Sequence, residues 1–209
     1  MPDLTEDARP VKTVLCYGDS ITWGYIPGNL GRYPLDKRWP SVLQKELGNQ
    51  FHVVAEGLRG RYTVHDQPFR AGRNGAALLQ PILETHSPID LLIIRLGTND
   101  VLHRADLTAF DAARGVEILA RIALASETGP ADGAPRVMLI APPRIRALPD
   151  ELRELCRGNP SESGHFSRHF REIAARRQLY FLDAAEVAEP GSGDGVHLTS
   201  RPNIYWARR

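Results

Sequence analysis

Apolar residues gather in five short runs along the chain, at residues 13–17 (TVLCY), 51–55 (FHVVA), 90–96 (DLLIIRL), 136–141 (RVMLIA) and 179–182 (LYFL). Within each run the apolar positions are nearly continuous and do not alternate with polar ones. Strands that are buried on both faces of a parallel sheet have this pattern. The five runs therefore predict five buried strands.

Helix-like stretches lie between these runs, at residues 39–47, 75–85, 107–126 and 161–178. Alternation of strand and helix predicts an α/β fold, with a parallel sheet and helices on both of its faces. No repeat, low-complexity tract or linker divides the chain, so residues 1–209 are expected to form a single domain, with residues 1–10 disordered. The longest irregular stretch, residues 57–74, is rich in Arg and Gly, and loops of this length are usually functional or mobile.

The turn that follows the first predicted strand reads GDSITWG and contains Ser20. Open α/β sheets place their chemistry at the carboxyl ends of strands, which is where this serine falls. Gly-Asp-Ser is also ordinary turn chemistry, and Ser20 taken alone indicates little. Near the other end of the chain, DGVH supplies His197 as a general base, with Asp194 three residues before it. Serine, histidine and aspartate together can activate a hydroxyl and stabilise the imidazolium that forms.

Two more segments follow predicted strands and contain hydrogen-bond donors. EGLRGR contains Gly60, and GTND contains Asn99. Glycine lets a backbone N–H approach a substrate closely, and an asparagine amide donates without carrying a charge. Both residues suit an oxyanion hole, in which each donor contributes about 3 kcal/mol to acyl transfer.

Composition removes several classes of function. Lys and Arg total 26 against 25 Asp and Glu, which gives a net charge of +1 and no general attraction to nucleic acid or anionic membranes. The opening MPDLTEDARP carries three acids and no apolar segment, so neither a signal peptide nor a membrane anchor is indicated, and a cytoplasmic protein is expected. Two cysteines, Cys16 and Cys156, make no disulfide framework and are expected to be free thiols.

Other motifs favour neither a metal nor a cofactor. His165 and His169 have a spacing that can bind zinc, but the glutamate of a metalloprotease is missing, and a solvated helix face is the better interpretation. The chain has no dinucleotide or P-loop glycine motif, and Thr22 breaks the G-x-S-x-G pattern of another esterase fold.

The four blocks GDSITWG, EGLRGR, GTND and DGVH, in this order and each after the appropriate strand, resemble the GDSL or SGNH hydrolases. The resemblance extends from about Val14 to Thr199. The sequence around these blocks is similar to the arylesterase and acyltransferase branch of that family. The similar segments are TWGY, RWPSVLQKELG and GRNGAALLQPILETHSPIDLLI. A three-layer α/β/α fold with a five-stranded parallel sheet and a shallow site at the strand ends is what this resemblance implies.

The resemblance also implies roles for the residues. Ser20 would be the nucleophile, His197 the base and Asp194 its orienting acid, while Ser20, Gly60 and Asn99 would form the oxyanion hole. Asp19, Trp23 and Tyr25 are candidates for the substrate pocket, although Trp23 and Tyr25 are as well explained by packing. No cofactor or metal is implied; the expected partner is a small-molecule ester, with a homo-oligomer allowed because some members of the family form one.

The chain departs from the family pattern in three places. Ile21 and Thr22 alter the first block without displacing the serine. Arg95 interrupts an apolar strand, where a charge must reach solvent or find a partner. After His197 the sequence LTSRPNIYWARR contains Pro202 and no amphipathic repeat, which predicts a shortened final helix.

A serine esterase acting on short-chain acyl, aryl or carbohydrate-acetate esters, with transfer of the acyl group to alcohols as a further activity, is the leading hypothesis. Two alternatives stay open. One is a non-catalytic relative that binds carbohydrate or lipid, and the other is a thioesterase or lysophospholipase, which would need a longer apolar channel than any sequence feature indicates.

Overall fold

A computed structural model describes residues 11–29 and 31–199 of the chain. Along the chain it contains β1 (Lys12–Gly18), α1 (Ser20–Trp23), η1 (Leu35–Lys37), α2 (Trp39–Leu47), β2 (Phe51–Gly57), α3 (Gly75–Thr85), β3 (Leu91–Arg95), α4 (Thr98–His103), α5 (Ala109–Leu124), η2 (Pro130–Asp132), β4 (Arg136–Ala141), α6 (Asp150–Arg153), η3 (Pro160–His165), α7 (Phe166–Arg177), β5 (Tyr180–Asp183) and η4 (Ala184–Glu186). The expected disorder of residues 1–10 and the expected shortening of the final helix fall on residues 1–10 and 200–209, outside the described part of the chain.

The five predicted strands form one parallel sheet in the order β2-β1-β3-β4-β5. The order in which strands are added to the sheet reverses at β1: β2 lies on one side of β1, and β3 to β5 follow on the other side. Gly18, the last residue of β1, pairs with Gly57 of β2 and with Arg95 of β3. Ser20 thus follows the strand at the topological switch point, where open α/β sheets bind their ligands.

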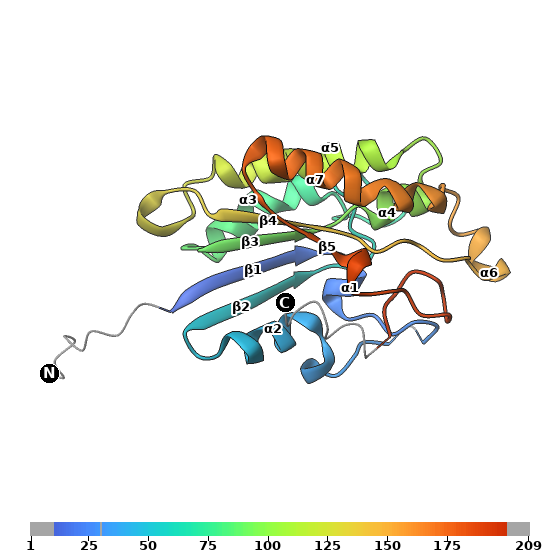
Figure 1. The fold of residues 1–209 in the computed structure, drawn as a ribbon, viewed down its shortest axis with the longest axis horizontal. Coiled ribbons are helices and arrows are strands. Elements are labelled where there is room, and N and C mark those ends of the chain that lie inside the picture. The colour runs from blue at the N-terminus through green and yellow to red at the C-terminus, as the bar shows by residue number, and fades with distance from the viewer. Residues whose placement is uncertain (1–10, 30, 200–209) are drawn as a thin grey trace, which may run out of the picture.

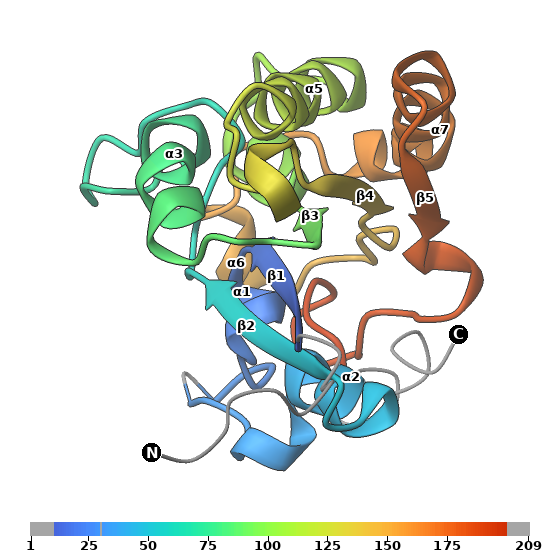
Figure 2. The same cartoon turned by 90° about the vertical axis from the view of Figure 1, so that its left-hand side faces the viewer.

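Helices cover both faces of the sheet, as the alternating pattern predicts. Helices α3, α5 and α7 lie on one face, and α2 with the short α1 lies on the other (Figures 1 and 2). Alternate residues of β1 belong to the two layers: Leu15 and Tyr17 pack toward α3, α5 and α7, while Val14 and Cys16 pack toward Trp39 of α2. The fold is therefore the three-layer α/β/α arrangement with a five-stranded parallel sheet.

Burial is less uniform along the sheet than the sequence predicts. The central strands β1, β3 and β4 are mostly buried, whereas β2 is only half-buried along its length and Tyr180 of β5 is exposed. These two strands are the edges of the sheet, where one neighbour is missing. Continuous apolar character in the sequence does not distinguish an edge strand from a central one.

Local signals explain where two of the helices begin. Helix α5 starts with a capping box, in which the Thr108 hydroxyl accepts from the N–H of Asp111 and the Asp111 carboxylate accepts from the N–H of Thr108. Helix α3 is capped by the side chain of Asn74, which accepts from two backbone N–H groups of the first turn. Helices α1 and α4 are not predicted by the sequence pattern, because four and six residues are too few to show a helical period.

Candidate active site

The turn that carries Ser20 is short and closely packed. Ser20 is the first residue of α1, and the carboxylate of Asp19 accepts a hydrogen bond from the N–H of Ile21 at 3.0 Å. The helix ends after one turn because Gly24 adopts a left-handed conformation, with φ of 92°. A Cβ at Gly57 would lie 2.2 Å from the backbone nitrogen of Trp23, so only glycine lets the end of β2 approach α1 this closely.

Ser20, His197 and Asp194 form a continuous chain of hydrogen bonds, although 177 residues separate the first two in sequence. The Ser20 hydroxyl lies 2.7 Å from Nε2 of His197, and Nδ1 of His197 lies 2.7 Å from Oδ2 of Asp194. With the imidazole neutral, the geometry is consistent with Nδ1–H donating to the carboxylate while Nε2 accepts from the serine hydroxyl. A hydroxyl held in this way can lose its proton to the imidazole as it attacks a carbonyl.

Asp194 is buried and kept ionised by the loop around it. Its Oδ1 accepts from the N–H groups of Val196 at 2.9 Å and His197 at 2.8 Å, and the side chain of His197 contacts Oδ2. Burial acts to raise the pKa of Asp194, but the hydrogen bonds and the charge of His197 outweigh it and hold the pKa below its ordinary value. An ionised carboxylate here fixes the tautomer of the histidine.

Backbone contacts fix the position of the Asp194–His197 loop. The N–H of Gly191 donates to the carbonyl of His197 at 2.9 Å, and the N–H of Arg146 donates to the carbonyl of Gly195 at 2.8 Å. Gly195 has a φ of 72°, and a Cβ there would lie 2.7 Å from the carbonyl oxygen of Ala147. The segment that follows β4 is therefore in direct contact with the loop that carries His197.

Hydrogen bonds connect the expected oxyanion donors to one another. The side-chain amide of Asn99 donates to the carbonyl of Arg61 at 3.0 Å, one residue after Gly60, which has a φ of 74°. The guanidinium of Arg61 donates in turn to the carbonyl of Gly18, two residues before Ser20. Within residues 11–29 and 31–199, the backbone N–H groups of Ser20 and Gly60 donate to no other residue. These two N–H groups and the second amide hydrogen of Asn99 can therefore serve a substrate oxygen.

Arg61 and Asp100 are two buried groups that sequence reasoning missed, and both hold the oxyanion region together. Arg61 lies over the ring of Tyr17, 4.0 Å from its centroid, and donates to the carbonyls of Gly18 and Glu56. Asp100 accepts from the hydroxyl of Thr63 at 2.6 Å, and burial raises its pKa to about 7. Both residues stand in the quoted blocks, but nothing in the sequence indicates that they are buried.

The partner of Arg95, which the sequence leaves open, is Asp19. The two side chains are 0% and 1% exposed, and Nη1 of Arg95 lies 2.9 Å from Oδ1 of Asp19. This ion pair corrects the expectation that Asp19 lines the substrate pocket, because its carboxylate points into the protein and caps α1. Arg95 thus stabilises the residue that directly precedes Ser20.

The other two pocket candidates lie at the outer side of the site. The ring of Tyr25 packs against the imidazole of His197, with 4.3 Å between centroids. The guanidinium of Arg59 lies over both Tyr25, at 4.9 Å, and Trp23, at 5.3 Å. Arg32 also stacks on Trp23, at 4.8 Å. Tyr25 and Trp23 therefore line the approach to His197 and are only half-buried.

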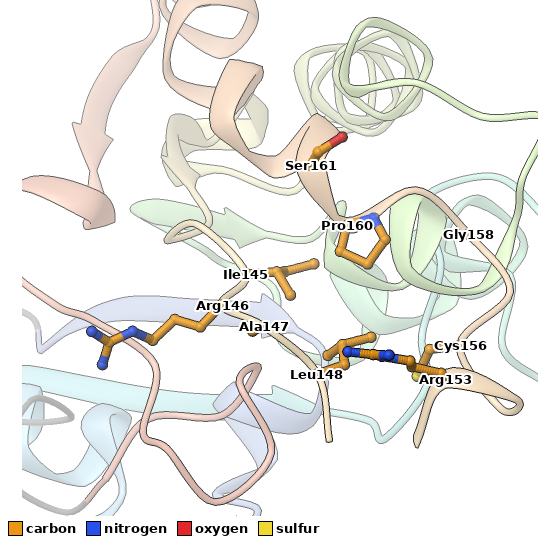
Figure 3. A pocket seen from close by; sticks show the side chains of 9 residues that line it. All are labelled: Ile145, Arg146, Ala147, Leu148, Arg153, Cys156, Gly158, Pro160 and Ser161. Atoms are coloured by element: carbon orange, nitrogen blue, oxygen red, sulfur yellow. The ribbon is translucent and has the colours of Figure 1, made fainter. Parts of the chain in front are cut away.

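A cavity of about 440 Å³ lies next to this site, but Ser20, Asp194 and His197 are not among the residues that line it. Figure 3 shows its lining, which is formed by Ile145, Arg146, Ala147, Leu148, Arg153, Cys156, Gly158, Pro160 and Ser161. Leu148 packs against Val196, and Arg146 extends away from the rest toward Pro190, to whose carbonyl it donates at 3.4 Å. The cavity and the Asp194–His197 loop therefore share a wall.

The remaining sequence expectations concern cysteines, histidines and membranes. Cys16, which is buried, and Cys156 are both free thiols. In the described part of the chain no three His, Cys, Asp or Glu side chains are grouped so that they could hold a metal ion, and His165 is exposed. None of the described helices combines the length and apolar character that crossing a bilayer requires.

A family comparison and a comparison with solved structures both find proteins that are similar to this chain. The sequence pattern of the GDSL-like lipase/acylhydrolase family matches residues 16–201. The solved structure of Est24, a carbohydrate acetylesterase from Sinorhizobium meliloti, is 33% identical over 94% of this chain and 95% of its own, with a TM-score of 0.89. A second carbohydrate acetylesterase family member from that organism is 38% identical over 94% of each chain, with a TM-score of 0.88.

The native aryl esterase of M. smegmatis is similar to the same degree, with 34% identity over 94% of each chain and a TM-score of 0.88. Among curated proteins, no sequence matches this chain significantly.

Proposed function

The chain belongs to the GDSL-like lipase/acylhydrolase family and is a carboxylic ester hydrolase of the SGNH type, and from this premise we propose that it is a serine esterase acting on short-chain acyl, aryl or carbohydrate-acetate esters. The hydrogen-bonded chain Ser20–His197–Asp194 is the observation that carries the proposal. Similarity at 33–38% identity to carbohydrate acetylesterases and an aryl esterase supports the substrate classes.

The reaction proceeds in two halves. In the first, Ser20 Oγ attacks the ester carbonyl while Nε2 of His197 takes its proton. The negative charge on the carbonyl oxygen is stabilised by the N–H groups of Ser20 and Gly60 and by the amide of Asn99. His197 then gives the proton to the departing alcohol, and the acyl group stays on Ser20.

In the second half a water molecule attacks the acyl-enzyme. His197 takes a proton from that water and returns it to Ser20 as the carboxylic acid leaves. An alcohol in place of the water would give transfer of the acyl group to a new ester. Both outcomes need the same base and the same oxyanion donors, so the competition between them depends on which acceptor reaches the acyl-enzyme.

The two alternatives are less well supported. A non-catalytic relative would have no need for a serine held 2.7 Å from an imidazole that is itself held by an ionised carboxylate. A thioesterase or lysophospholipase would need a long apolar channel, and the cavity beside the triad loop is lined in part by Arg146 and Arg153.

Hydrolysis of p-nitrophenyl acetate, butyrate and octanoate by the wild type and by Ser20→Ala tests the proposal. We expect rates that fall as the acyl chain lengthens, and a loss of at least about 10³-fold in kcat for Ser20→Ala, because no other group in the site replaces the nucleophile. A Ser41→Ala variant on α2 is the matched control. Activity that survives in Ser20→Ala, or a preference for octanoate, would overturn the corresponding part of the proposal.

A further inference from the structure

Arginines without acidic partners surround the outer side of the site. Among the described residues, Arg32, Arg59, Arg70 and Arg73 take part in no ion pair, whereas most exposed ion pairs of the protein join arginines elsewhere to acids, as in Arg104–Asp106, Arg153–Asp150 and Arg168–Glu172. With a net charge of only +1 for the whole chain, the charge near the site is strongly unbalanced. We call Arg32, Arg59, Arg70 and Arg73 the arginine rim.

Direct contacts connect the arginine rim to the catalytic groups. The guanidinium of Arg59 stacks on the ring of Tyr25, and that ring packs on the imidazole of His197. The ring of Tyr25 therefore lies between Arg59 and the expected base. Nη1 of Arg70 lies 3.4 Å from the position that a Cβ would take on Gly60, the expected oxyanion donor. Nε of Arg73 donates to the carbonyl of Arg59 at 2.9 Å.

The rim is held by carbonyls and aromatic rings, which leaves its charge uncompensated. Arg32 donates to the carbonyl of Trp23 and stacks on its ring, and Arg73 donates to the carbonyls of Arg59 and Ala71. Burial, followed by repulsion from Arg70 and Arg59, lowers the pKa of Arg73, as expected when like charges are close.

Within the ranges that the structure describes, the acids nearest the site contact other residues, and none of them forms an ion pair with the arginine rim. Asp19 pairs with Arg95, Glu56 contacts His86 at 3.0 Å, and Asp194 contacts His197. A guanidinium offers planar, forked donors that match a carboxylate, sulfate or phosphate. Four of them beside a catalytic serine are suited to an anionic substrate.

We propose that the arginine rim binds an anionic group on the alcohol part of the ester substrate, so that the protein prefers esters of alcohols or phenols that carry a carboxylate, sulfate or phosphate. The inference rests on the proposed esterase function. The alcohol part is indicated because His197 gives its proton to the leaving alcohol, and Tyr25 with Arg59 lies on the His197 side of the site.

Two aryl acetates of nearly the same shape test this. The first, 4-acetoxybenzoate, carries a carboxylate on its leaving group, and the second, 4-acetoxybenzamide, is neutral. The measured quantity is the ratio of kcat/KM for the anionic ester to that for the neutral ester, with each value divided by the rate at which hydroxide hydrolyses that ester. We expect a wild-type ratio of about ten or more, which falls toward one as NaCl is raised to about 0.5 M because salt screens the attraction.

Variants assign the preference to the rim. Arg59→Gln and Arg70→Gln should each lower the ratio by roughly five- to tenfold, and Arg59→Lys should keep most of it, because it retains the charge while losing the planar fork. Arg136→Gln is the matched control: it removes an exposed arginine at the amino end of β4, whereas the site lies at the carboxyl ends of the strands, and it should leave the ratio unchanged.

The outcomes separate the two proposals. If neither ester is hydrolysed, the esterase function fails. If the neutral ester is hydrolysed but the wild-type ratio is near one, or Arg59→Gln and Arg70→Gln slow both esters equally, the esterase stands and the anionic subsite is overturned. Should Arg59→Gln fold poorly through loss of its stacking on Tyr25 and Trp23, the exposed Arg70→Gln decides the question.

Discussion

A serine hydroxyl becomes a nucleophile only when a base takes its proton and donors stabilise the charge that follows. Ser20 has both within the described structure, because His197 contacts its hydroxyl and Asn99 is tied to the Gly60 turn through Arg61. We expect each of these residues to make a separate contribution to catalysis, so each can be tested by itself.

Asn99→Ala should act on the transition state. We expect kcat to fall by about 10²-fold with little change in KM, because the amide meets the carbonyl oxygen most strongly when that oxygen is charged. Steady-state kinetics on p-nitrophenyl acetate, alongside a melting curve that checks the fold, is the measurement. If KM rises while kcat is kept, Asn99 binds the ground-state substrate and is not an oxyanion donor.

Asp100 should make the protein less stable as the pH rises. Burial raises its folded-state pKa to about 7, above the value of roughly 4 for an exposed carboxyl, so the folded state holds the proton more tightly between those pH values. The free energy of unfolding should therefore fall from about pH 4 to about pH 7 through this group, on the order of 2–4 kcal/mol.

Urea unfolding across this pH range, for the wild type and Asp100→Asn, measures the effect. As the pH rises from about 4 to about 7, the unfolding free energy of the wild type should fall relative to that of Asp100→Asn, because only the wild type has a proton to lose at this position. A difference that is constant from pH 4 to pH 8 would show that Asp100 does not titrate in this way.

The sequence predicts the candidate reactive residues more readily than it predicts the buried residues that support them. The chemistry of the quoted blocks can be inferred from single residue types, as it is for Ser20, Gly60, Asn99, Asp194 and His197. The sequence shows that Arg95 is an unexpected charge in an apolar strand, but it does not show which residue pairs with it. The partner, Asp19, lies 76 residues away in sequence, and the sheet register brings the two residues together. The burial of Asp19 is absent from the local pattern for the same reason.

At the scale of the elements, the contact between β2 and α1 positions the nucleophile. Gly57→Ala would place a Cβ against the backbone of α1, where no flexible side chain can move aside. We expect roughly 3 kcal/mol of lost stability and a lower kcat, because the displaced helix carries Ser20.

Gly164→Ala, where a Cβ meets no atom within 4 Å, is the comparison for Gly57→Ala. Chemical unfolding and p-nitrophenyl acetate kinetics on both variants give the result. Equal stability of the two variants would mean that α1 can move away from β2 without cost.

Elements with a marked apolar pattern are predicted by the sequence, and the two short helices at the site are not. The predicted bounds of α2, α3 and β4 coincide with those in the structure, because each has a clear apolar pattern and a breaker at its end. Helices α1 and α4 carry Ser20 and Asn99, yet the sequence pattern predicts a turn at Ser20 and no helix at Asn99. Tertiary contacts with the strand ends, and not an intrinsic period, determine these two short helices.

At the scale of the whole molecule, alternation of strand and helix predicts the parallel sheet, but not its order. The position of β1 between β2 and β3 arises from how the layers pack, and it is this position that places Ser20 at the switch point.

Among the described residues, part of the apolar surface on the α2 face of the sheet stays accessible to water. Leu91, Met138 and Leu182 on this face are only partly buried. We expect this apolar surface to cause self-association or marginal stability, since each Å² left in water forgoes about 25 cal/mol. Light scattering and thermal melting at several protein concentrations measure it. A monodisperse monomer whose high Tm does not change with concentration would contradict the expectation.

The central claim is that Ser20 is the nucleophile of a serine esterase, and covalent labelling tests it most directly. A fluorophosphonate probe reacts with a serine only when a neighbouring base activates it. After incubation, intact mass and peptide mapping should show one adduct, on Ser20, in the wild type and in Ser41→Ala, and none in Ser20→Ala. An adduct on another serine, or labelling that persists in Ser20→Ala, would contradict the account.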